Sequence, residues 1–314
     1  MKTTMSTRRE FVKSAALLGA GGALGLGLTR FGATALDGAT AATTATAANT
    51  TAAATTAAAT AAKQRVPVVP EGFVSLFDGA TLNGWSRQVR DLKNPSLGKW
   101  EVKDGAIIGG QDVPGLGSYL VSDETFGDFE LMLDARPDWP ADTGFYVRTN
   151  SRGNIGYQVL IDYRTNGGIG GYYGNGMGNF HAWSYMFTAE RDAGGRVLKL
   201  IPHPAVEPHK GNKKVDLDFC APADVFLKVW KLNDWNTFRL RAVGELPLLT
   251  TWINGEKIAE LDTAKMQFPG WDPKAVLAKV GRSGHISLEV HNGDTERWGP
   301  GVVSRWRNIY VKKL

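Results

Sequence analysis

Cysteine is nearly absent from this sequence, since Cys220 is the only one in 314 residues. An intramolecular disulfide is therefore excluded, and the folded chain depends on packing and hydrogen bonds alone. No local motif marks Cys220 as a nucleophile. We expect it to be a buried structural thiol.

A large excess of charge is also absent once the N-terminal segment is set apart. The formal net charge is +5, but five basic residues and one acidic residue lie in residues 1–35, which leaves about +1 for the remainder. A chain without a basic stripe lacks the electrostatic footprint of proteins that bind nucleic acid or anionic lipid. We therefore expect neither partner.

Long hydrophobic runs are missing too, because the apolar stretch at residues 15–28 is short and rich in glycine. It follows Ser6-Thr7-Arg8-Arg9-Glu10-Phe11-Val12-Lys13, a twin-arginine pattern, and precedes Ala33-Thr34-Ala35, an A-x-A cleavage site. The sequence predicts a twin-arginine signal peptide over residues 1–35, a periplasmic or secreted protein, and no membrane span after cleavage. An uncleaved anchor or a chance basic amphipath is the alternative.

The next segment, residues 36–63, consists almost wholly of Ala and Thr. It lacks the large apolar side chains that offset the entropy of ordering, so we expect a disordered linker. Residues 64–314 are enough for one large domain with a sizeable core.

The apolar pattern of residues 64–314 has mostly period two, in short runs separated by Gly, Asp, Asn and Pro. Asp104-Gly105 and Asn254-Gly255 mark two hairpin turns. This pattern predicts an all-β sandwich. Two stretches, residues 167–178 and 189–231, do not fit the meander, and we expect long loop excursions of the kind that carry function.

Three predicted strands, at residues 143–149, 157–162 and 284–292, place apolar side chains on one face and polar ones on the other. If these strands share a sheet, its second face carries Tyr146, Arg148, Gln158, Asp162, Glu289 and His291. A solvated exterior with cross-strand ion pairs is one interpretation of this face. A carbohydrate site is the other, because aromatic rings stack on sugars while Arg, Asp and His bind hydroxyl groups.

The segment Gly72-Phe73-Val74-Ser75-Leu76-Phe77-Asp78-Gly79, followed by Thr81-Leu82-Asn83-Gly84-Trp85, resembles the opening signature of the 3-keto-disaccharide hydrolase domain family. Further motifs of that family have similar counterparts, in order, at residues 100–105, 126–131, 143–148, 156–162, 235–236, 284–291 and 306–309. The resemblance covers nearly all of residues 64–314. It implies a concanavalin-like or lectin-like jelly-roll β-sandwich.

The same resemblance implies a substrate already oxidised to a ketone at sugar C3. The ketone acidifies the C2 proton, a base removes it, the C1 aglycone leaves by β-elimination, and hydration completes a net hydrolysis. Such a site needs a base, a group that stabilises the enolate oxygen, and an acid. It does not need the paired carboxylates of ordinary glycosidases, and the E-x-D-x-x-E strand of lectin-like glucanases is absent from the sequence.

The resemblance assigns roles to residues of this chain. Asp162 is the expected base, or Glu289 in place of the family's usual Glu; Arg148 is expected to stabilise the enolate. His291 is expected to be the acid or a metal ligand, with a structural hydrogen bond as the alternative. The expected substrate-binding residues are Tyr146, Gln158, His181 and Trp183.

Departures from the family pattern keep a second function open. Gln158 and Leu160 replace the family's Glu and Gln, and Asp142-Thr143 replaces Asn-Ser. Since Gln is no general base, a non-catalytic carbohydrate-binding protein of the cell envelope is the alternative. An envelope scaffold for an oxidoreductase is a third hypothesis.

Cofactors are left open by the sequence. A divalent cation is unsupported, because His203 and His209 lack a recognised ligand spacing. An exported sugar 3-dehydrogenase is the expected source of the oxidised glycoside.

Overall fold

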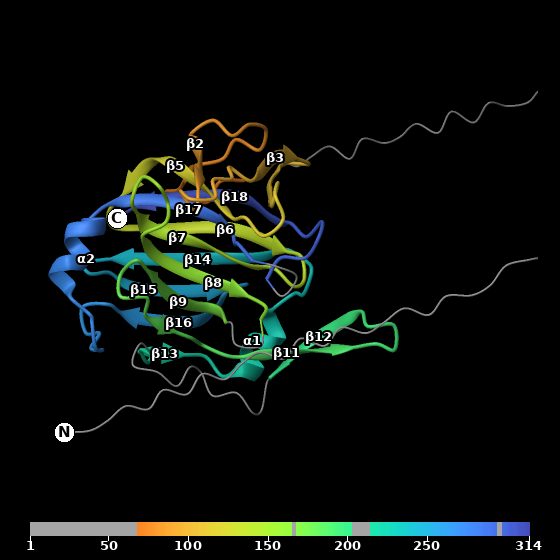
Figure 1. Cartoon of the computed structure of the whole chain (residues 1–314). Helices are drawn as coiled ribbons and strands as arrows, with labels where there is room; N and C mark the ends of the chain where they lie inside the picture. Colours follow the sequence, from red (N-terminus) through yellow and green to blue (C-terminus); the bar gives the residue numbers. More distant parts are fainter. Residues whose placement is uncertain (1–67, 165–167, 203–213, 294–296) are drawn as a thin grey trace, which may run out of the picture. The chain divides into compact units, whose positions relative to one another are not determined.

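The computed structural model describes residues 68–164, 168–202, 214–293 and 297–314. The predicted signal peptide, the predicted linker with its boundary at residue 64, and His203 and His209 lie outside these residues. Two antiparallel sheets pack face to face, which confirms the predicted all-β, lectin-like sandwich (Figure 1).

The larger sheet has nine strands in the described part of the chain. Its order is β13 (Phe219–Cys220), β16 (Glu256–Asp262), β15 (Leu248–Ile253), β14 (Asn236–Val243), β6 (Phe129–Pro137), β18 (Ser304–Lys313), β4 (Ala106–Gly110) and β3 (Lys99–Lys103), with β1 (Val74–Ser75) paired to β18. The hairpins β3–β4 and β15–β16 confirm the two predicted turns, since Asp104 and Asn254 adopt the positive φ values of 53° and 49° that such turns require.

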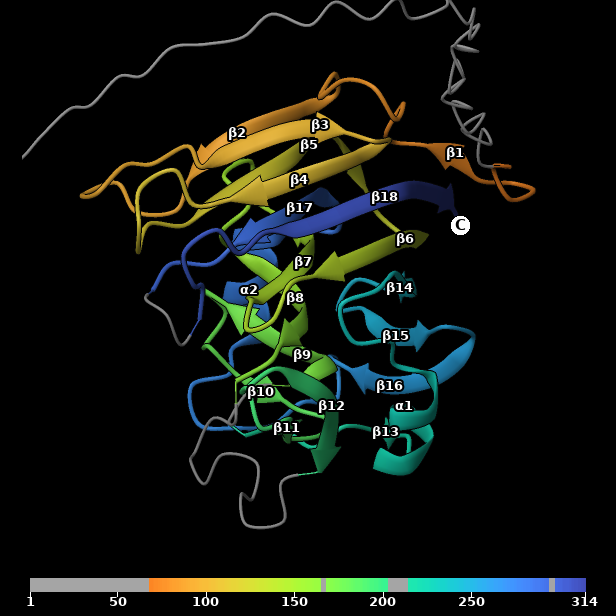
Figure 2. The same cartoon turned by 90° about the vertical axis from the view of Figure 1, so that its right-hand side faces the viewer.

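The second sheet has seven strands in the order β10 (His181–Ala182), β9 (Ile169–Asn175), β8 (Gly156–Asp162), β7 (Asp142–Thr149), β17 (Gly284–Val290), β5 (Ser118–Phe126) and β2 (Trp85–Val89). Figure 2 shows the green strands β7 to β9 of this sheet beside the blue-green strands β14 to β16 of the other. The core lies between them, where the Phe145 and Phe238 rings meet edge to face at 5.6 Å.

Most of the glycine-rich stretch at 167–178, expected to be a loop, belongs to strand β9 (Ile169–Asn175). β9 needs glycine because neighbouring groups come very close: a Cβ at Gly171 would lie 2.5 Å from the Ala182 carbonyl, and one at Gly174 would lie 2.2 Å from the Phe180 ring. The expectation of a loop was wrong because these glycines serve packing and not a turn.

The described part of the predicted excursion at 189–231 contains secondary structure. Strands β11 (Phe187–Arg191) and β12 (Val197–Pro202) form a hairpin that begins just before the excursion, and the short helix α1 (Ala223–Val229) and β13 lie within it. Phe226 of α1 stacks on Phe187 at 4.8 Å and on Trp230 at 5.6 Å. Trp230 in turn meets Phe238 of β14 edge to face at 6.2 Å, which fastens the excursion to the sandwich.

A second helix, α2 (Pro273–Val280), precedes β17. Asp272 caps its N-terminus by accepting hydrogen bonds from the backbone N–H groups of Lys274 and Ala275, and Pro273 occupies the first position. Val276 and Val280 are buried. The helix thus anchors the chain just before β17.

Cys220 is exposed on the edge strand β13, so the prediction of a buried thiol was wrong. Partial desolvation raises the pKa of its thiol. A raised pKa disfavours the thiolate and agrees with the absence of a nucleophile motif.

No helix among the described residues is both long enough and apolar enough to cross a bilayer.

Candidate functional site

A cavity of about 480 Å³ lies on the face of the seven-stranded sheet that points away from the core. Its lining comes from four strands and from the segments that follow β2, β8, β10 and β17. The lining residues are Arg90, Asp142, Tyr146, Gln158, Leu160, Asp162, Arg164, Tyr173, Asn175, His181, Trp183, His291, Asn292 and Arg297.

Strand pairing builds the floor of this cavity. In the register of β7 and β8, Asp142 stands opposite Asp162, and Tyr146 stands opposite Gln158. Their alternate neighbours, such as Phe145 and Val159, face the core. The strands therefore have the predicted two faces, but every residue of β7 and β8 is buried, so the polar face is not a wet exterior.

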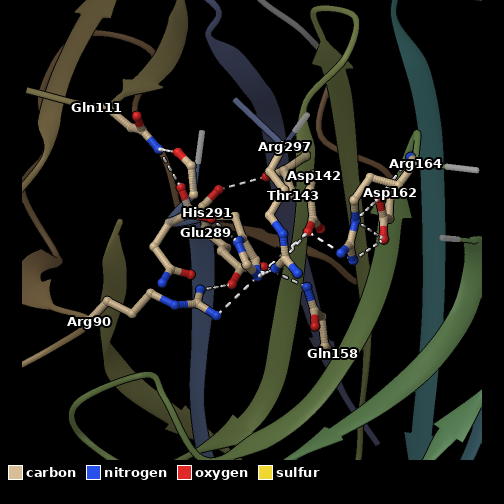
Figure 3. Close-up of polar contacts among 12 residues, drawn as sticks. Arg90, Gln111, Asp142, Thr143, Gln158, Asp162, Arg164, Glu289, His291 and Arg297 are labelled. Atoms are coloured by element: carbon tan, nitrogen blue, oxygen red, sulfur yellow. Dashed lines mark hydrogen bonds and ion pairs between the residues drawn. The ribbon is translucent and has the colours of Figure 1, made fainter. Parts of the chain in front are cut away.

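Glu289 is completely buried at the floor and is held by three donors (Figure 3). The Arg90 guanidinium pairs with its Oε1 atom, the Tyr146 hydroxyl donates to the same oxygen at 3.2 Å, and the Gln158 amide donates to Oε2 at 2.5 Å. A buried charge is stable only when it is paired and hydrogen-bonded in this way.

This arrangement explains Gln158, the departure from the family pattern. A Glu at position 158 would bring a second carboxylate against Glu289, whereas the Gln amide supplies a donor. Burial and the Glu289 charge also raise the pKa of Tyr146, so its hydroxyl keeps the proton that it donates.

Asp142 and Asp162 are neighbouring carboxyl groups, and both contact Arg164. The Arg164 Nη2 atom lies 2.5 Å from Asp162 Oδ2 and 3.0 Å from Asp142 Oδ2, while its Nε atom donates to both oxygens of Asp162 at 2.9 and 3.0 Å. Burial, followed by the Asp162 charge, raises the pKa of Asp142 well above its usual value. Asp142 therefore takes up a proton more readily than an ordinary aspartate does.

His291 follows β17 and touches Asp142. Its Nδ1 atom donates to the Asn292 carbonyl, so Nε2 carries the lone pair. The Nε2 atom lies 3.2 Å from Arg90 Nη2, 3.4 Å from Arg297 Nη1 and 3.5 Å from Asp142 Oδ2. Burial and the Arg90 charge lower the pKa of His291 well below its usual value, which makes the imidazole neutral at neutral pH.

The end of β17 is fixed by neighbours outside the charged cluster. Thr143 Oγ1 donates to the Glu289 carbonyl at 2.6 Å, and Gln111 Nε2 donates to the His291 carbonyl at 2.8 Å (Figure 3). These bonds hold Glu289 and His291 at fixed positions, as a preorganised site requires.

Aromatic side chains form one wall of the cavity. The Tyr173 ring of β9 lies 4.7 Å from the His181 ring, which lies 4.9 Å from the Trp183 ring. His181 and Trp183 are thus where the sequence predicts them, at the cavity. Rings of this kind offer flat apolar surfaces to the C–H faces of a sugar.

Arg148 does not lie on the cavity face, so its predicted placement was wrong. A bulge interrupts the pairing of β7 with β17 at this point, and Arg148 has a φ of 51°. Its guanidinium is bound by the Gly127 and Gly244 carbonyls and by Asp128. These groups tie β7 to the connection between β5 and β6 and to the turn between β14 and β15, and Arg148 has a structural role there.

Among the lining residues to which the sequence interpretation gave no functional role are Arg90, Asp142, Arg164, Tyr173 and Arg297. Four of them carried no motif. Asp142 did carry a signal, because its replacement of the family's usual Asn stands directly before the 143–148 motif.

Among the described residues, no group of three or more His, Cys, Asp or Glu side chains is arranged to hold a metal ion.

Comparison with known proteins adds a family to this geometry. The family model described as the 3-keto-alpha-glucoside-1,2-lyase-like domain matches residues 72–312. A 3-keto-disaccharide hydrolase of Bacteroides thetaiotaomicron is 33% identical over 104 residues, an alignment that covers 31% of this chain and 35% of that protein. The match therefore spans about a third of that relative.

Two solved structures resemble the chain at low sequence identity. A candidate glycosyl hydrolase of Parabacteroides distasonis has a TM-score of 0.42 at 15% identity, with 78% of this chain and 94% of that chain covered. The carbohydrate binding module CBM66 of Bacillus subtilis has a TM-score of 0.40 at 12% identity, with 73% and 96% covered.

Proposed function

The chain belongs to the 3-keto-alpha-glucoside-1,2-lyase-like domain family, and from this premise we propose that it cleaves 3-keto-glycosides by β-elimination followed by hydration. One observation carries the proposal: a carboxyl group with a raised pKa and an imidazole with a lowered pKa touch inside one cavity. Environments that push two pKa values apart in this way mark an acid and a base.

The reaction needs a proton removed and a proton supplied. A base takes the C2 proton, and the electrons of that bond move toward the C3 ketone to form an enolate. When the enolate collapses, C1=C2 forms and the C1–O bond breaks, so the aglycone oxygen takes a proton from an acid. Water then adds its hydroxyl to C1 and its proton to C2, which completes the net hydrolysis.

We assign the base to His291 and the acid to Asp142. His291 is neutral and its Nε2 lone pair can accept the proton, while Asp142 holds a proton 3.5 Å away. Arg90 faces the same Nε2 atom at 3.2 Å, and its fixed positive charge is suited to the enolate oxygen.

This assignment changes the roles that the resemblance gives to Asp162 and Glu289. Both oxygens of Asp162 are bound by Arg164, and Glu289 is bound by Arg90, Tyr146 and Gln158. In both side chains, donors already occupy the carboxylate oxygens that would have to take the C2 proton. In our proposal Asp162 sets the pKa of Asp142, and Glu289 positions Arg90.

The test is release of the aglycone from a 3-keto-glucoside by the full chain. We expect His291→Gln and Asp142→Asn each to lower kcat by about 100-fold or more, because each removes a general acid or base. Deuterium at C2 should slow the wild-type enzyme if proton removal limits the rate. His285→Gln, in the strand β17 that leads to His291, is the control. No release by the wild-type chain, or equal rates for the wild type and His291→Gln, would contradict the proposal.

A second candidate is a non-catalytic carbohydrate-binding protein, favoured by Gln158 in place of the family's Glu. It predicts affinity for saccharides, measured by calorimetry, without any turnover of the ketone. The Asp142→Asn assay separates the two functions, since a binding protein has no rate to lose.

We also propose export through the twin-arginine pathway, supported by the motif at residues 6–13. An exported sugar 3-dehydrogenase would then supply the ketone in the same compartment. Replacing Arg8 and Arg9 with Lys should retain the protein in the cytoplasm, as measured by fractionation. Unchanged export of that variant would contradict this part of the proposal.

A further inference from the structure

The three arginines of the cavity differ in how far their charges are neutralised. Arg90 pairs with Glu289, and Arg164 binds Asp162 through two nitrogens. Arg297 has no such partner among the described residues: Asp142 is the sole carboxylate within ion-pair distance, at 3.8 Å, and that contact is too long for a hydrogen bond.

Arg297 is also the arginine most open to a ligand. Its side chain is 40% exposed, compared with 19% for Arg90 and 22% for Arg164. Among the described residues, its one side-chain hydrogen bond is the 3.4 Å contact between Nη1 and His291 Nε2. A guanidinium in a cavity with a single long bond keeps several N–H donors available.

The backbone holds Arg297 in place. Its carbonyl accepts a hydrogen bond from the Asp142 N–H at 2.8 Å, and the next residue, Trp298, is buried and donates to the Val302 carbonyl at 2.8 Å. The stem lies across Gly293, where a Cβ would come within 2.7 Å of the Arg297 Cδ atom. Arg297 is therefore positioned by the fold at the edge of the reacting groups.

We propose that Arg297 determines substrate specificity by binding a carboxylate on the glycoside, so that the preferred substrates are acidic 3-keto-glycosides. The inference rests on the proposed function, because it concerns the same cavity. Arg binds a carboxylate through two parallel N–H donors, and the site already satisfies the charges of its other two arginines. With a neutral glycoside, the described residues offer the Arg297 charge no carboxylate closer than Asp142 at 3.8 Å.

Two matched pairs of substrates test the inference. The first pair is the 3-keto-glucoside of 4-hydroxybenzoate and that of its methyl ester, which differ by one aglycone charge. The second pair is methyl 3-keto-glucuronide and methyl 3-keto-glucoside, which differ by one sugar charge. We expect the wild type to prefer the acidic member of at least one pair by about tenfold in kcat/KM, and that pair locates the carboxylate.

Arg297→Gln should abolish this preference by raising KM for the acidic member about tenfold or more relative to KM for the neutral member. Arg196→Gln, on an exposed arginine of the β11–β12 hairpin, is the matched control. Absence of a preference in both pairs would overturn the inference. An equal loss of kcat on acidic and neutral members in Arg297→Gln would do so as well, because Arg297 would then act in the chemistry.

A calorimetric arm keeps this inference separate from the proposed function. The unoxidised glucosides of 4-hydroxybenzoate and its methyl ester cannot undergo elimination, so they report binding alone. If no ketone is cleaved, the proposed function fails, yet tighter binding of the acid that is lost in Arg297→Gln still supports carboxylate recognition. Equal binding of acid and ester, together with absent cleavage, would contradict both the proposed function and carboxylate recognition by Arg297.

Discussion

The outward faces of the two sheets carry the same kinds of side chain in very different surroundings. On the nine-stranded sheet, Glu130 pairs with Arg239 at 2.7 Å, and their side chains are 11% and 46% exposed. On the seven-stranded sheet, Glu289 pairs with Arg90, and their side chains are 0% and 19% exposed. Water therefore screens the first pair more than the second.

Aromatic residues and arginines do not distinguish the two faces. Arg307 lies 4.0 Å from the Trp235 ring and Arg239 lies 5.2 Å from the Trp252 ring, both on the nine-stranded sheet. The difference comes from the segments that carry Arg90, Trp183 and Arg297, which enclose one face only. Coverage, and not composition, turns a polar sheet face into a site with shifted pKa values.

The two faces should differ most in how much stability is lost when the acidic partner of the ion pair is removed. Glu289→Ala leaves the Arg90 charge without its buried counterion and should lower the free energy of unfolding by about 3–5 kcal/mol. Glu130→Ala on the exposed face should cost about 1 kcal/mol or less. Urea denaturation measures both losses of stability. Equal losses would show that burial does not distinguish the two ion pairs.

A smaller effect is expected when a second charge is added to the buried face. Gln158→Glu brings a carboxylate against Glu289 and should destabilise the fold at pH 7 by on the order of 2 kcal/mol. One of the two carboxyl groups would then have a raised pKa, so the loss should shrink as the pH falls. Gln158→Met lacks the added charge and is the control: its loss of stability should not show this recovery in acid.

The neutral state of His291 gives the buried face a pH dependence of its own. Because burial and Arg90 lower its pKa from 6.5 in the folded chain, the unfolded chain takes up the proton first. The stabilising contribution is complete above pH 6.5 and is lost as the pH falls toward the folded pKa. Thermal unfolding of His291→Gln should therefore depend less on pH below 6.5 than that of the wild type or His285→Gln. Parallel curves for all three would mean that His291 is not held neutral.

The smallest expected change in stability is that of Asp142→Asn. The raised pKa of Asp142 means that its contribution is complete below pH 3.8 and is lost as the pH rises toward the folded pKa. Since Asn has the shape of the protonated acid, the variant should be as stable as the wild type at pH 7, or more stable, even though its activity is lost. Asp134→Asn, which weakens hydrogen bonds to Arg307 and Asn308 on the exposed face, should be less stable. A large loss of stability in Asp142→Asn would show that the buried acid is ionised.

Much of this fold follows from local sequence patterns. Alternating apolar residues predict β14 and β17, and the turn residues Asp104-Gly105 and Asn254-Gly255 predict two hairpins that the structure contains. Composition failed at β9, because the close contacts that require its glycines come from Phe180 and Ala182, which the pattern of β9 does not encode.

The candidate site was only partly predictable, for a similar reason. Period two placed Tyr146, Gln158 and Asp162 on one face, since they lie in regular stretches of strand. The same rule misplaced Arg148, where a bulge interrupts the alternation. Arg90 and Arg297 come from segments outside the strands, and only the folded chain brings them to Glu289 and His291.

The register that sets Asp142 opposite Asp162 has a consequence for insertions and deletions. The proton affinity of Asp142 depends on its neighbour across the ladder, so it is a property of the strand pairing and not of a loop. Changes of length in the connection at residues 150–155 leave that pairing intact. A one-residue deletion within β7 or β8 would move one aspartate to the opposite face and abolish the acid in a single step. We therefore expect lineages of this domain to vary in the length of that connection while the lengths of these two strands stay fixed.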